Sequence, residues 1–382
     1  MDLTESPQEQ AFRAEARDWL ADHVPREPLP SGDTREGFTL HVEWEKTLHA
    51  ARWSVVSWPA AYGGRDASVW EWLAFEEEYY RAGAPQRVTQ NGIFLLAPTL
   101  FAFGTQEQQD TLLPRMAAAD DLWCQGWSEP GAGSDLASLT SRAERDESRG
   151  GWRLFGQKTW TTRGAFCTHL FGLFRSDPAS QRHRGLTYFL VPLDAPGVTV
   201  RGFSRLDGDE GFAEVWFDDV FVPDSAVLGG VGAGWRVAMA TTGSERGLTL
   251  RSPGRFTAAV DRLVALARQH PEALTGSLRE RITQAWIDAE AYRLFTLQQV
   301  TNSVSGRERV GESSLNKLFW SELDVRIQSA ALDLLGPVAE VDGPWARGFL
   351  FSLAGPIYAG TNEVQRNIVA ERLLGLPRAA RG

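Results

Sequence analysis

The residues best suited to chemistry lie in the segment SEPGAGSD, from Ser128 to Asp135. Its two glycines, Gly131 and Gly133, have no side chains, so backbone N–H groups there can come close to a ligand phosphate. The hydroxyls and carboxylates around them add fixed polar contacts. This pattern is typical of a cofactor-binding loop, although on composition alone a polar surface turn is the better interpretation.

The composition limits the kinds of partner. A chain of 382 residues with 43% hydrophobic content can bury a sizeable core and form more than one structural unit. A net charge of −10 and the absence of a Lys/Arg-rich run argue against nucleic acid. No apolar run is long enough for a membrane span, and the N-terminus does not resemble a signal peptide, so we expect a cytoplasmic protein. Cys124 and Cys167 cannot form a disulfide framework, and no spacing suggests a metal site.

The elements that must position the loop fall into three parts, of which the first is helical. Ser6, Pro7 and Glu9 form a capping-box pattern at the start of a helix. Further helical periodicity covers residues 70–80 and 106–116. We therefore expect an all-helical N-terminal domain over residues 1–121.

The second part, residues 122–231, changes to short runs rich in β-branched and aromatic residues that alternate with Gly, Pro and Asp. Such runs are typical of a small β domain. The expected strands are residues 152–155, 170–174, 186–191, 198–200, 214–217 and 220–222.

Helical periodicity returns in the third part, residues 232–382, which we expect to be a helical bundle. Ser277 and Glu280 suggest a second capping box, ahead of a long helix that runs to about Gly306. Another helix is expected from about Ser314 to Leu335, ending at the helix-stop pair formed by Gly336 and Pro337. A last helix follows Thr361.

Four blocks of sequence, in this order, resemble the acyl-CoA dehydrogenases. They are GTQEQQDTLLPRM (104–116), WCQGWSEPGAGSDLASL (123–139), GQKTWTTRGA (156–165) and YAGTNEVQRNIVAERLLGLPR (358–378). The resemblance implies an α+β multi-domain fold with an N-terminal helical domain, a central small β-barrel domain and a C-terminal four-helix bundle. It also implies the activity, which is FAD-dependent α,β-dehydrogenation of an acyl thioester.

The resemblance also implies which residues contact the flavin. The segment from Gln125 to Ser134 matches the part of the family that lines the flavin ring and pyrophosphate. Trp160 matches an aromatic residue packed against the isoalloxazine, and Thr162 matches a hydroxyl residue beside flavin N5. The cofactor-binding residues implied in this way are Gln125, Trp127, Ser128, Gly133, Ser134, Trp160, Thr162, Gly336, Thr361 and Glu363.

Dehydrogenation beside a thioester needs a base for the α-proton, usually a carboxylate in a dry pocket. Many family members have this Glu immediately before the Gly-Thr pair of the last block, where this chain has Ala359. A subgroup of the family uses a Glu from the helix after the β domain, and Glu245 matches that position. Glu245 is therefore the candidate catalytic base, with a solvated or ion-paired helix residue as the alternative.

Two neighbouring positions are candidate substrate contacts. Arg246 matches a residue that orders the acyl-CoA site, although a structural ion pair is an equal explanation. Ala359 has no basic side chain, but its backbone N–H can donate to the thioester oxygen.

Two segments depart from the family pattern. Residues 269–277, QHPEALTGS, lack the arginine with which the family often binds flavin pyrophosphate from a neighbouring subunit. Pro253, in Ser252-Pro253-Gly254, should kink or end a helix that is continuous in the family. Such a break could widen the acyl pocket for a branched, bulky or polycyclic group, or be only a local irregularity.

The resemblance implies partners as well. They are an electron-transferring flavoprotein as electron acceptor and an oligomer, either a homodimer or homotetramer or a heteromer. The acyl carrier, coenzyme A or an acyl carrier protein, stays open at this point. Two further alternatives are a flavin oxidase or hydroxylase on the same fold, and a non-catalytic subunit of a heteromeric dehydrogenase.

Overall fold

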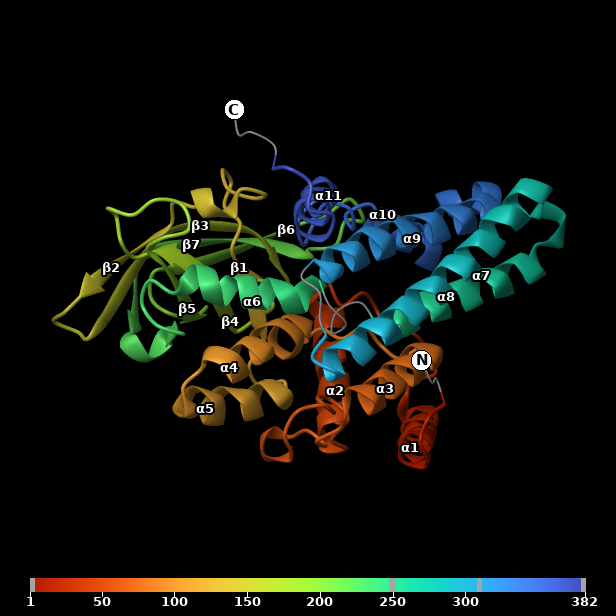
Figure 1. Cartoon of the computed structure of the whole chain (residues 1–382), viewed down its shortest axis with the longest axis horizontal. Coiled ribbons are helices and arrows are strands. Elements are labelled where there is room, and N and C mark those ends of the chain that lie inside the picture. Colours follow the sequence, from red (N-terminus) through yellow and green to blue (C-terminus); the bar gives the residue numbers. More distant parts are fainter. Residues whose placement is uncertain (1–3, 247–251, 308–310, 379–382) are drawn as a thin grey trace. The chain divides into compact units, whose positions relative to one another are not determined.

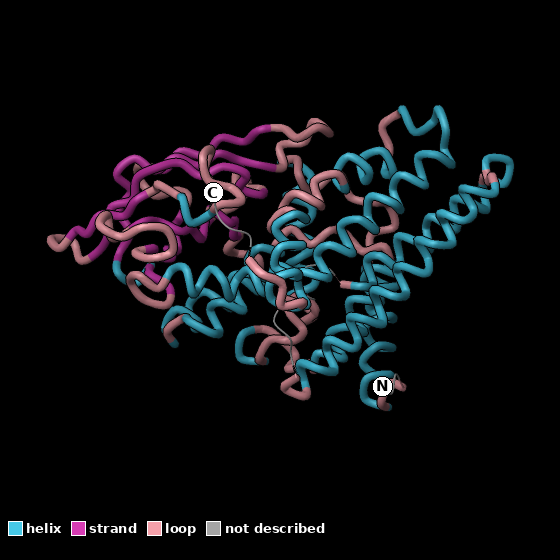
Figure 2. Tube along the Cα trace, turned by 45° about the horizontal axis from the view of Figure 1, so that its top comes forward, coloured by secondary structure: helices cyan, strands magenta, loops and turns pink. Residues whose placement is uncertain are grey.

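The computed structural model describes residues 4–246, 252–307 and 311–378, with the side chains of residues 244–246 left out (Figure 1). The chain packs into two compact units. One consists of Met1–Val24, Ser68–Ala84 and Arg246–Gly382, and the other of Pro25–Ala67 and Pro85–Glu245. We call them the helical unit and the sheet unit. In Figure 2 the strands gather into one magenta layer that belongs to the sheet unit.

The helical unit is built around an apolar core contributed mainly by α7, α8 and α9. Buried aromatic and aliphatic residues such as Phe256, Tyr292 and Trp320 fill it. Figure 1 shows α7, α8 and α9 running side by side. The elements of the helical unit are α1 (Pro7–His23), α3 (Val69–Arg81), α7 (Pro253–Gln269), α8 (Gly276–Val304), α9 (Glu312–Leu335), α10 (Pro344–Ser352) and α11 (Asn362–Ile368), with short 3₁₀ helices at Pro271–Ala273 and Gly336–Glu340 and a π-helix at Val369–Leu373.

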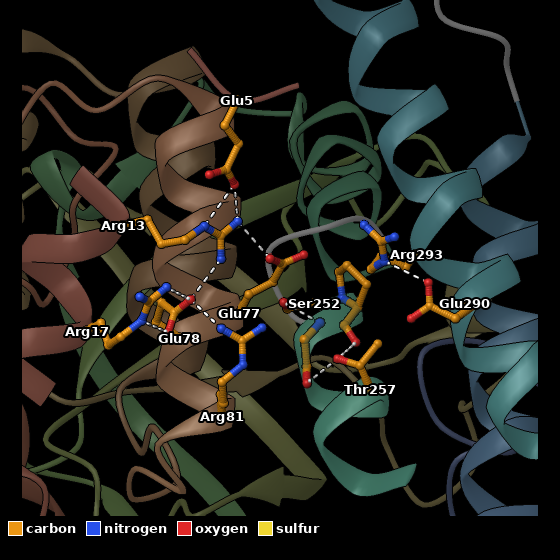
Figure 3. A network of polar contacts seen from close by, with 12 residues as sticks. Glu5, Arg13, Arg17, Glu77, Glu78, Arg81, Ser252, Thr257, Glu290 and Arg293 are labelled. Atoms are coloured by element: carbon orange, nitrogen blue, oxygen red, sulfur yellow. Dashed lines mark hydrogen bonds and ion pairs between the residues drawn. The ribbon is translucent and has the colours of Figure 1, made fainter. Parts of the chain in front are cut away.

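Helix α1 begins at the expected capping box, which is confirmed, and a charged network ties it to α3. Arg13 and Arg17 of α1 and Arg81 of α3 all reach the carboxylate of Glu78, at 3.0, 3.1 and 2.5 Å (Figure 3). The Glu78 side chain is only 2% exposed. Burial alone would raise the pKa of Glu78, but the three guanidinium groups outweigh burial and lower it to about 2.

The helix break expected at Pro253 is confirmed. Helix α6 (Gly234–Arg246) is described to Arg246, and a separate helix, α7, begins at Pro253; residues 247–251 lie outside the described residues. The Ser252 hydroxyl accepts the Gly254 N–H, so Ser252 caps the new helix and Pro253 occupies its first position, where a missing N–H is tolerated. The capping box expected at Ser277 is wrong, because α8 starts at Gly276 with Thr275 as its N-cap.

The sheet unit contains α2 (Arg35–Ala50), α4 (Ala97–Phe103), α5 (Gln106–Ala117) and α6, with a 3₁₀ turn at Ala60–Tyr62 and a π-helix at Asn91–Leu96. Its sheet has eight strands within the described residues, paired in the order β6-β7-β3-β2-β4-β5-β8, with β1 parallel to β4. The strands are β1 (Trp123–Gly126), β2 (Arg142–Asp146), β3 (Gly151–Thr162), β4 (His169–Arg175), β5 (Leu186–Pro192), β6 (Val198–Phe203), β7 (Phe212–Pro223) and β8 (Val227–Leu228).

The sheet differs from the sequence expectation in three strands that were not expected, β1, β2 and β8, and in the extent of β3 and β7. Strands β1 and β2 were not expected, because WCQG is short and RAERD is charged, with mostly exposed side chains. The expected strands at 214–217 and 220–222 are one continuous strand, β7. Asp218 and Asp219 lie within β7, with Asp219 at a positive φ of 58°. No helix in the described ranges has the length and apolar character needed to cross a membrane.

Candidate functional site

The SEPGAGSD loop follows β1 directly and closes into a tight turn. Glu129 and Ala132 exchange two backbone hydrogen bonds, of 2.9 and 3.0 Å. A Cβ atom added at Gly131 or Gly133 would meet no atom within 4 Å, so both glycines face open space. Gly133 and Ser134 are exposed. The loop therefore offers accessible backbone and a hydroxyl to a ligand, as the sequence pattern predicts.

A buried ion pair supports the loop from behind. Lys158 of β3 is fully buried, and its Nζ lies 2.8 Å from Oε1 of Glu129. Glu129 also accepts hydrogen bonds from the backbone N–H groups of Thr140 and Ser141, at 2.6 and 2.9 Å. Burial would raise the pKa of Glu129, but Lys158 and these donors lower it to about 2. Glu129 is thus an ionised anchor of the loop.

The same ion pair ties the two sequence blocks of the sheet unit together. Burial lowers the pKa of Lys158, and Glu129 opposes that shift. A backbone hydrogen bond of 2.9 Å from Thr159 to the carbonyl of Ser128 lies beside the pair. The loop and β3 are therefore joined by both a side-chain and a backbone contact.

Trp160 occupies an unusual position on β3. Its φ is 58°, in the left-handed region that an aromatic residue rarely adopts. The pairing of β3 with β7 is irregular here, between Lys158 and Thr161. The indole is 60% exposed and packs edge-on against Phe203 and Phe212, with centroids 5.3 and 5.5 Å away. The strand thus presents a flat aromatic surface outward at the cost of backbone strain, which is common at binding sites.

Four buried polar groups in β1, in Trp127 just after it and in β3 have no hydrogen-bond partner within the described residues. They are Nε1 of Trp123, Nε2 of Gln125, Nε1 of Trp127 and Oγ1 of Thr161. Buried N–H and O–H groups of this kind can bond a ligand. A ring system with hydrogen-bond acceptors, such as an isoalloxazine, would suit the N–H donors of Gln125 and Trp127, and Trp160 would supply a stacking face. The residues therefore fit a flavin.

The end of β3 is held by a second buried ion cluster. Thr162 is followed by Arg163, whose Nε lies 2.7 Å from Oδ1 of Asp33, and Arg205 reaches Oδ2 of the same carboxylate at 2.8 Å. Burial would raise the pKa of Asp33, but the two arginines lower it. This cluster fixes the turn that carries Thr162.

Helix α6 carries the candidate base, Glu245, and is held in place by contacts with α4 and β5. The hydroxyl of Thr241 lies 2.9 Å from that of Thr99 on α4 and 3.5 Å from the Tyr188 hydroxyl on β5. Tyr188 packs edge-on against Trp127, at 6.4 Å between ring centroids. Glu245 follows Thr241 by four residues, one turn further along α6. The helix that carries Glu245 is therefore anchored, while the side chains of Glu245 and Arg246 lie outside the described part of the structure.

The remaining candidates lie in the helical unit. Gly336 ends α9 with a φ of 55°. The Thr361 hydroxyl caps α11 by accepting the Val364 N–H at 3.3 Å, and Glu363 is exposed in the first turn of that helix. Ala359 has a φ of 56°. The candidates are thus divided between the two units. Within the helical unit, Ala359, Thr361 and Glu363 lie close together in the chain, whereas Gly336 lies at the C-terminal end of α9, away from the α9 residues Lys317, Ser321 and Glu322 that contact α11.

The residues that support the site could not be found from the sequence. Lys158 lies inside the KTW motif, but a lysine in a strand gives no signal of burial. Asp33 and Arg205 lie far from Arg163 in the sequence, and no pattern links them. The one signal in the sequence is Glu129, because a carboxylate that is buried next to a Gly-rich loop needs a cation nearby.

Comparisons with known proteins identify the family of the chain. Three family models match: the N-terminal domain of acyl-CoA dehydrogenases over residues 6–120, the middle domain over 124–220 and the C-terminal domain over 232–374. Acyl-CoA dehydrogenase IpdE1 of Mycobacterium tuberculosis is 43% identical, over 97% of this chain and 98% of that protein. The protein of the same name from Mycolicibacterium smegmatis is 41% identical, over 98% and 99%.

Solved structures give the same result. The "Tcur3481-Tcur3483 steroid ACAD" structure superposes with a TM-score of 0.89 at 27% identity, over 99% of this chain and 100% of that one. The ChsE4-ChsE5 complex from Mycobacterium tuberculosis superposes with a TM-score of 0.84 at 28% identity, over the same shares. The chain belongs to the acyl-CoA dehydrogenase family, and it catalyses FAD-dependent dehydrogenation of an acyl-CoA.

Proposed function

We propose that this chain forms the α,β double bond of a CoA thioester that bears a steroid-derived acyl group, with Glu245 as the base. Two observations together support the base assignment. Position 359 is an alanine, which has no basic side chain, and a glutamate, Glu245, stands on the anchored helix α6. The acyl group is suggested by the neighbour named as a steroid enzyme, which matches 99% of the chain at 27% identity.

The division of α6 from α7 supports a bulky acyl group. A helix that continued past Arg246 would present its side chains at regular helical spacing. Here a new helix with its own N-cap begins at Pro253 instead. We interpret this helix break as the feature that makes room for a wide acyl group. A polycyclic group needs more width than a straight acyl chain.

In the proposed reaction Glu245 takes the α-proton onto its carboxylate, while donors around the thioester oxygen, including the Ala359 N–H, hold the developing negative charge. Arg246 orders the acyl-CoA beside the base. The chemistry that FAD supplies when bound is acceptance of the hydride that leaves the β-carbon.

Most of the proposed flavin contacts belong to the sheet unit. Gln125, Trp127, Ser128, Gly133 and Ser134 meet the ring and phosphates, and Trp160 and Thr162 pack beside the ring. The buried N–H groups of Gln125 and Trp127 and the exposed indole of Trp160 support these assignments. Gly336, Thr361 and Glu363 reach a cofactor from the helical unit.

The proposal includes partners and a location. One structural neighbour is a complex of two chains with different names, ChsE4 and ChsE5, which supports a heteromer of related subunits, with a homodimer or homotetramer as the other arrangement. A second subunit would also supply the pyrophosphate arginine that residues 269–277 lack.

We propose an electron-transferring flavoprotein as the electron acceptor. A cytoplasmic location agrees with the two free cysteines, Cys124 and Cys167.

Anaerobic bleaching of the flavin tests the substrate class. The purified protein, reconstituted with FAD, is mixed with CoA thioesters of steroid carboxylic acids, of straight-chain fatty acids and of branched short acids. The proposal predicts that the steroid thioesters reduce the flavin with at least about tenfold higher kcat/KM than the others. Preferential bleaching by a straight-chain thioester would refute the steroid assignment. A chain that takes up no FAD alone but does so with a related subunit would establish the heteromer.

A further inference from the structure

The turn before α11 has an unusual backbone. Ala359 and Gly360 are consecutive residues with positive φ, 56° and 79°. Glycine adopts this region freely, but alanine does not, because its Cβ approaches the carbonyl oxygen. The turn leads directly to Thr361, the N-cap of α11. An alanine held in this conformation needs support from its surroundings.

Gln365 supplies that support. Its side chain is fully buried, and Nε2 donates to the carbonyl oxygens of both Ala359 and Gly360, at 3.1 and 3.3 Å. The side-chain amide of Gln365 thus donates hydrogen bonds to two consecutive peptide carbonyls of the turn. The backbone N–H of Gln365 donates to the Thr361 carbonyl at 2.9 Å, so the residue is fixed by the first turn of its own helix.

Asn362 anchors this helix turn to α9. Its Oδ1 accepts hydrogen bonds from Nζ of Lys317 at 2.7 Å and from Oγ of Ser321 at 3.2 Å. Lys317, Ser321 and Asn362 are all buried. The turn is therefore held by Gln365, and the first turn of α11 is held by α9.

We propose that Gln365 is a positioning residue for dehydrogenation: it keeps Ala359 and Gly360 in the left-handed conformation that directs Ala359 and Thr361 toward the thioester and the flavin. This inference rests on the proposed function, which assigns those two residues to the substrate and the cofactor. Gln365 itself touches neither ligand. Its effect passes through the shape of the turn.

The first test removes the donors without changing the volume much. Gln365→Met leaves both carbonyls without their side-chain donor. We expect the rate constant for flavin reduction by acyl-CoA to fall roughly tenfold, with KM changed less than about twofold. The affinity of the apoprotein for FAD, followed by flavin fluorescence, should fall as well because Thr361 shifts.

The rescue distinguishes positioning from general stability. Ala359→Gly removes the steric cost of the left-handed conformation, so adding it to Gln365→Met should restore the reduction rate to within about threefold of wild type. As a folding control, Ser352→Ala deletes another buried hydrogen bond to a backbone carbonyl in the same unit and should leave the reduction rate unchanged. A double variant as slow as Gln365→Met would overturn the proposal.

A second variant keeps the test valid if Gln365→Met does not fold. Gln365→Glu has the same size, but its carboxylate repels both carbonyls when ionised and donates one hydrogen bond when protonated. Its reduction rate relative to wild type should therefore rise as the pH falls. A ratio that does not depend on pH contradicts the proposal.

The two proposals fail in different ways. If the wild-type protein binds FAD but no acyl-CoA bleaches it, the proposed function fails, while the comparison of FAD affinities still tests Gln365. If wild type is bleached and Gln365→Met matches it in both rate and FAD affinity, only the positioning role is wrong.

Discussion

Two buried carboxylates, Glu78 in the helical unit and Glu129 in the sheet unit, set how the protein responds to acid. Both have a pKa lowered to about 2 from an ordinary value of 4.5. A carboxylate whose folded-state pKa is depressed stabilises the fold above its unfolded pKa, and this stability is lost as the pH falls through the folded value. The contribution is therefore complete above about pH 5 and disappears toward about pH 2.

We predict that Glu78→Gln and Glu129→Gln each lower the free energy of unfolding at pH 6 by about 3 kcal/mol, with a smaller loss at pH 3. The loss is larger at pH 6 because the stability that comes from the lowered pKa is complete there, whereas at pH 3 the carboxyl of the unfolded chain is already mostly protonated. Urea unfolding at the two pH values, followed by circular dichroism, measures it. Glu340→Gln, at an exposed position, is the control. A loss of equal size at both pH values would contradict the assignment of these pKa values.

At this scale the sequence offers candidate ligand contacts but not the residues that support them. Trp160 and Thr162 belong to a continuous motif, and their flavin contacts remain predictions. The burial of Lys158 in the same motif could not be predicted, because nothing local distinguishes a buried lysine in a strand from an exposed one. The partnership of Asp33 with Arg163 depends on chain segments that only the fold brings together.

Among the elements, the contact between α3 and α7 depends on a glycine. A Cβ added at Gly254 would lie 2.9 Å from Cα of Glu77 and 3.1 Å from the carbonyl oxygen of Glu76, both parts of the α3 backbone. Since neither atom can move without shifting the helix, the two helices can pack this closely only if residue 254 has no side chain.

We predict that Gly254→Ala lowers the free energy of unfolding by about 1–3 kcal/mol through this overlap. Gly276→Ala is the matched control, because Gly276 also lies in the first turn of a long helix but an added Cβ there meets no atom within 4 Å. Gly276→Ala should leave the free energy of unfolding unchanged or raise it by up to about 1 kcal/mol. Equal effects of the two substitutions, measured by urea unfolding, would argue against the close contact.

Helices were more predictable than strands. The helix starting after Ser6 and the break at Pro253 follow from capping and proline chemistry, which act locally. The N-cap of α8 was misplaced by two residues, because Thr275 and Ser277 are both suitable caps and the choice depends on tertiary packing. Strand β2 was missed because its side chains are mostly polar, and it is its pairing with β3 and β4 that makes it a strand.

For the whole molecule, the sequence predicted the order of helices, sheet and helices, which the family models match. The domain boundaries after residues 121 and 231 remain a prediction. The packing into two units could not be predicted, because α1 and α3 come early in the chain yet pack with the C-terminal helices. Hydrophobic periodicity indicates which face of a helix is buried but not which distant element covers it.

The central claim is that Glu245 removes the α-proton. Many members of the family use a glutamate at the position of Ala359 for this step. The most direct measurement is anaerobic flavin reduction by the best acyl-CoA substrate, compared between wild type, Glu245→Gln and the surface control Glu340→Gln. We predict that Glu245→Gln retains FAD and its yellow colour, while the reduction rate falls by about 10²- to 10⁴-fold; Glu340→Gln should match wild type. Reduction of Glu245→Gln at the wild-type rate would contradict the claim and exclude Glu245 as the base.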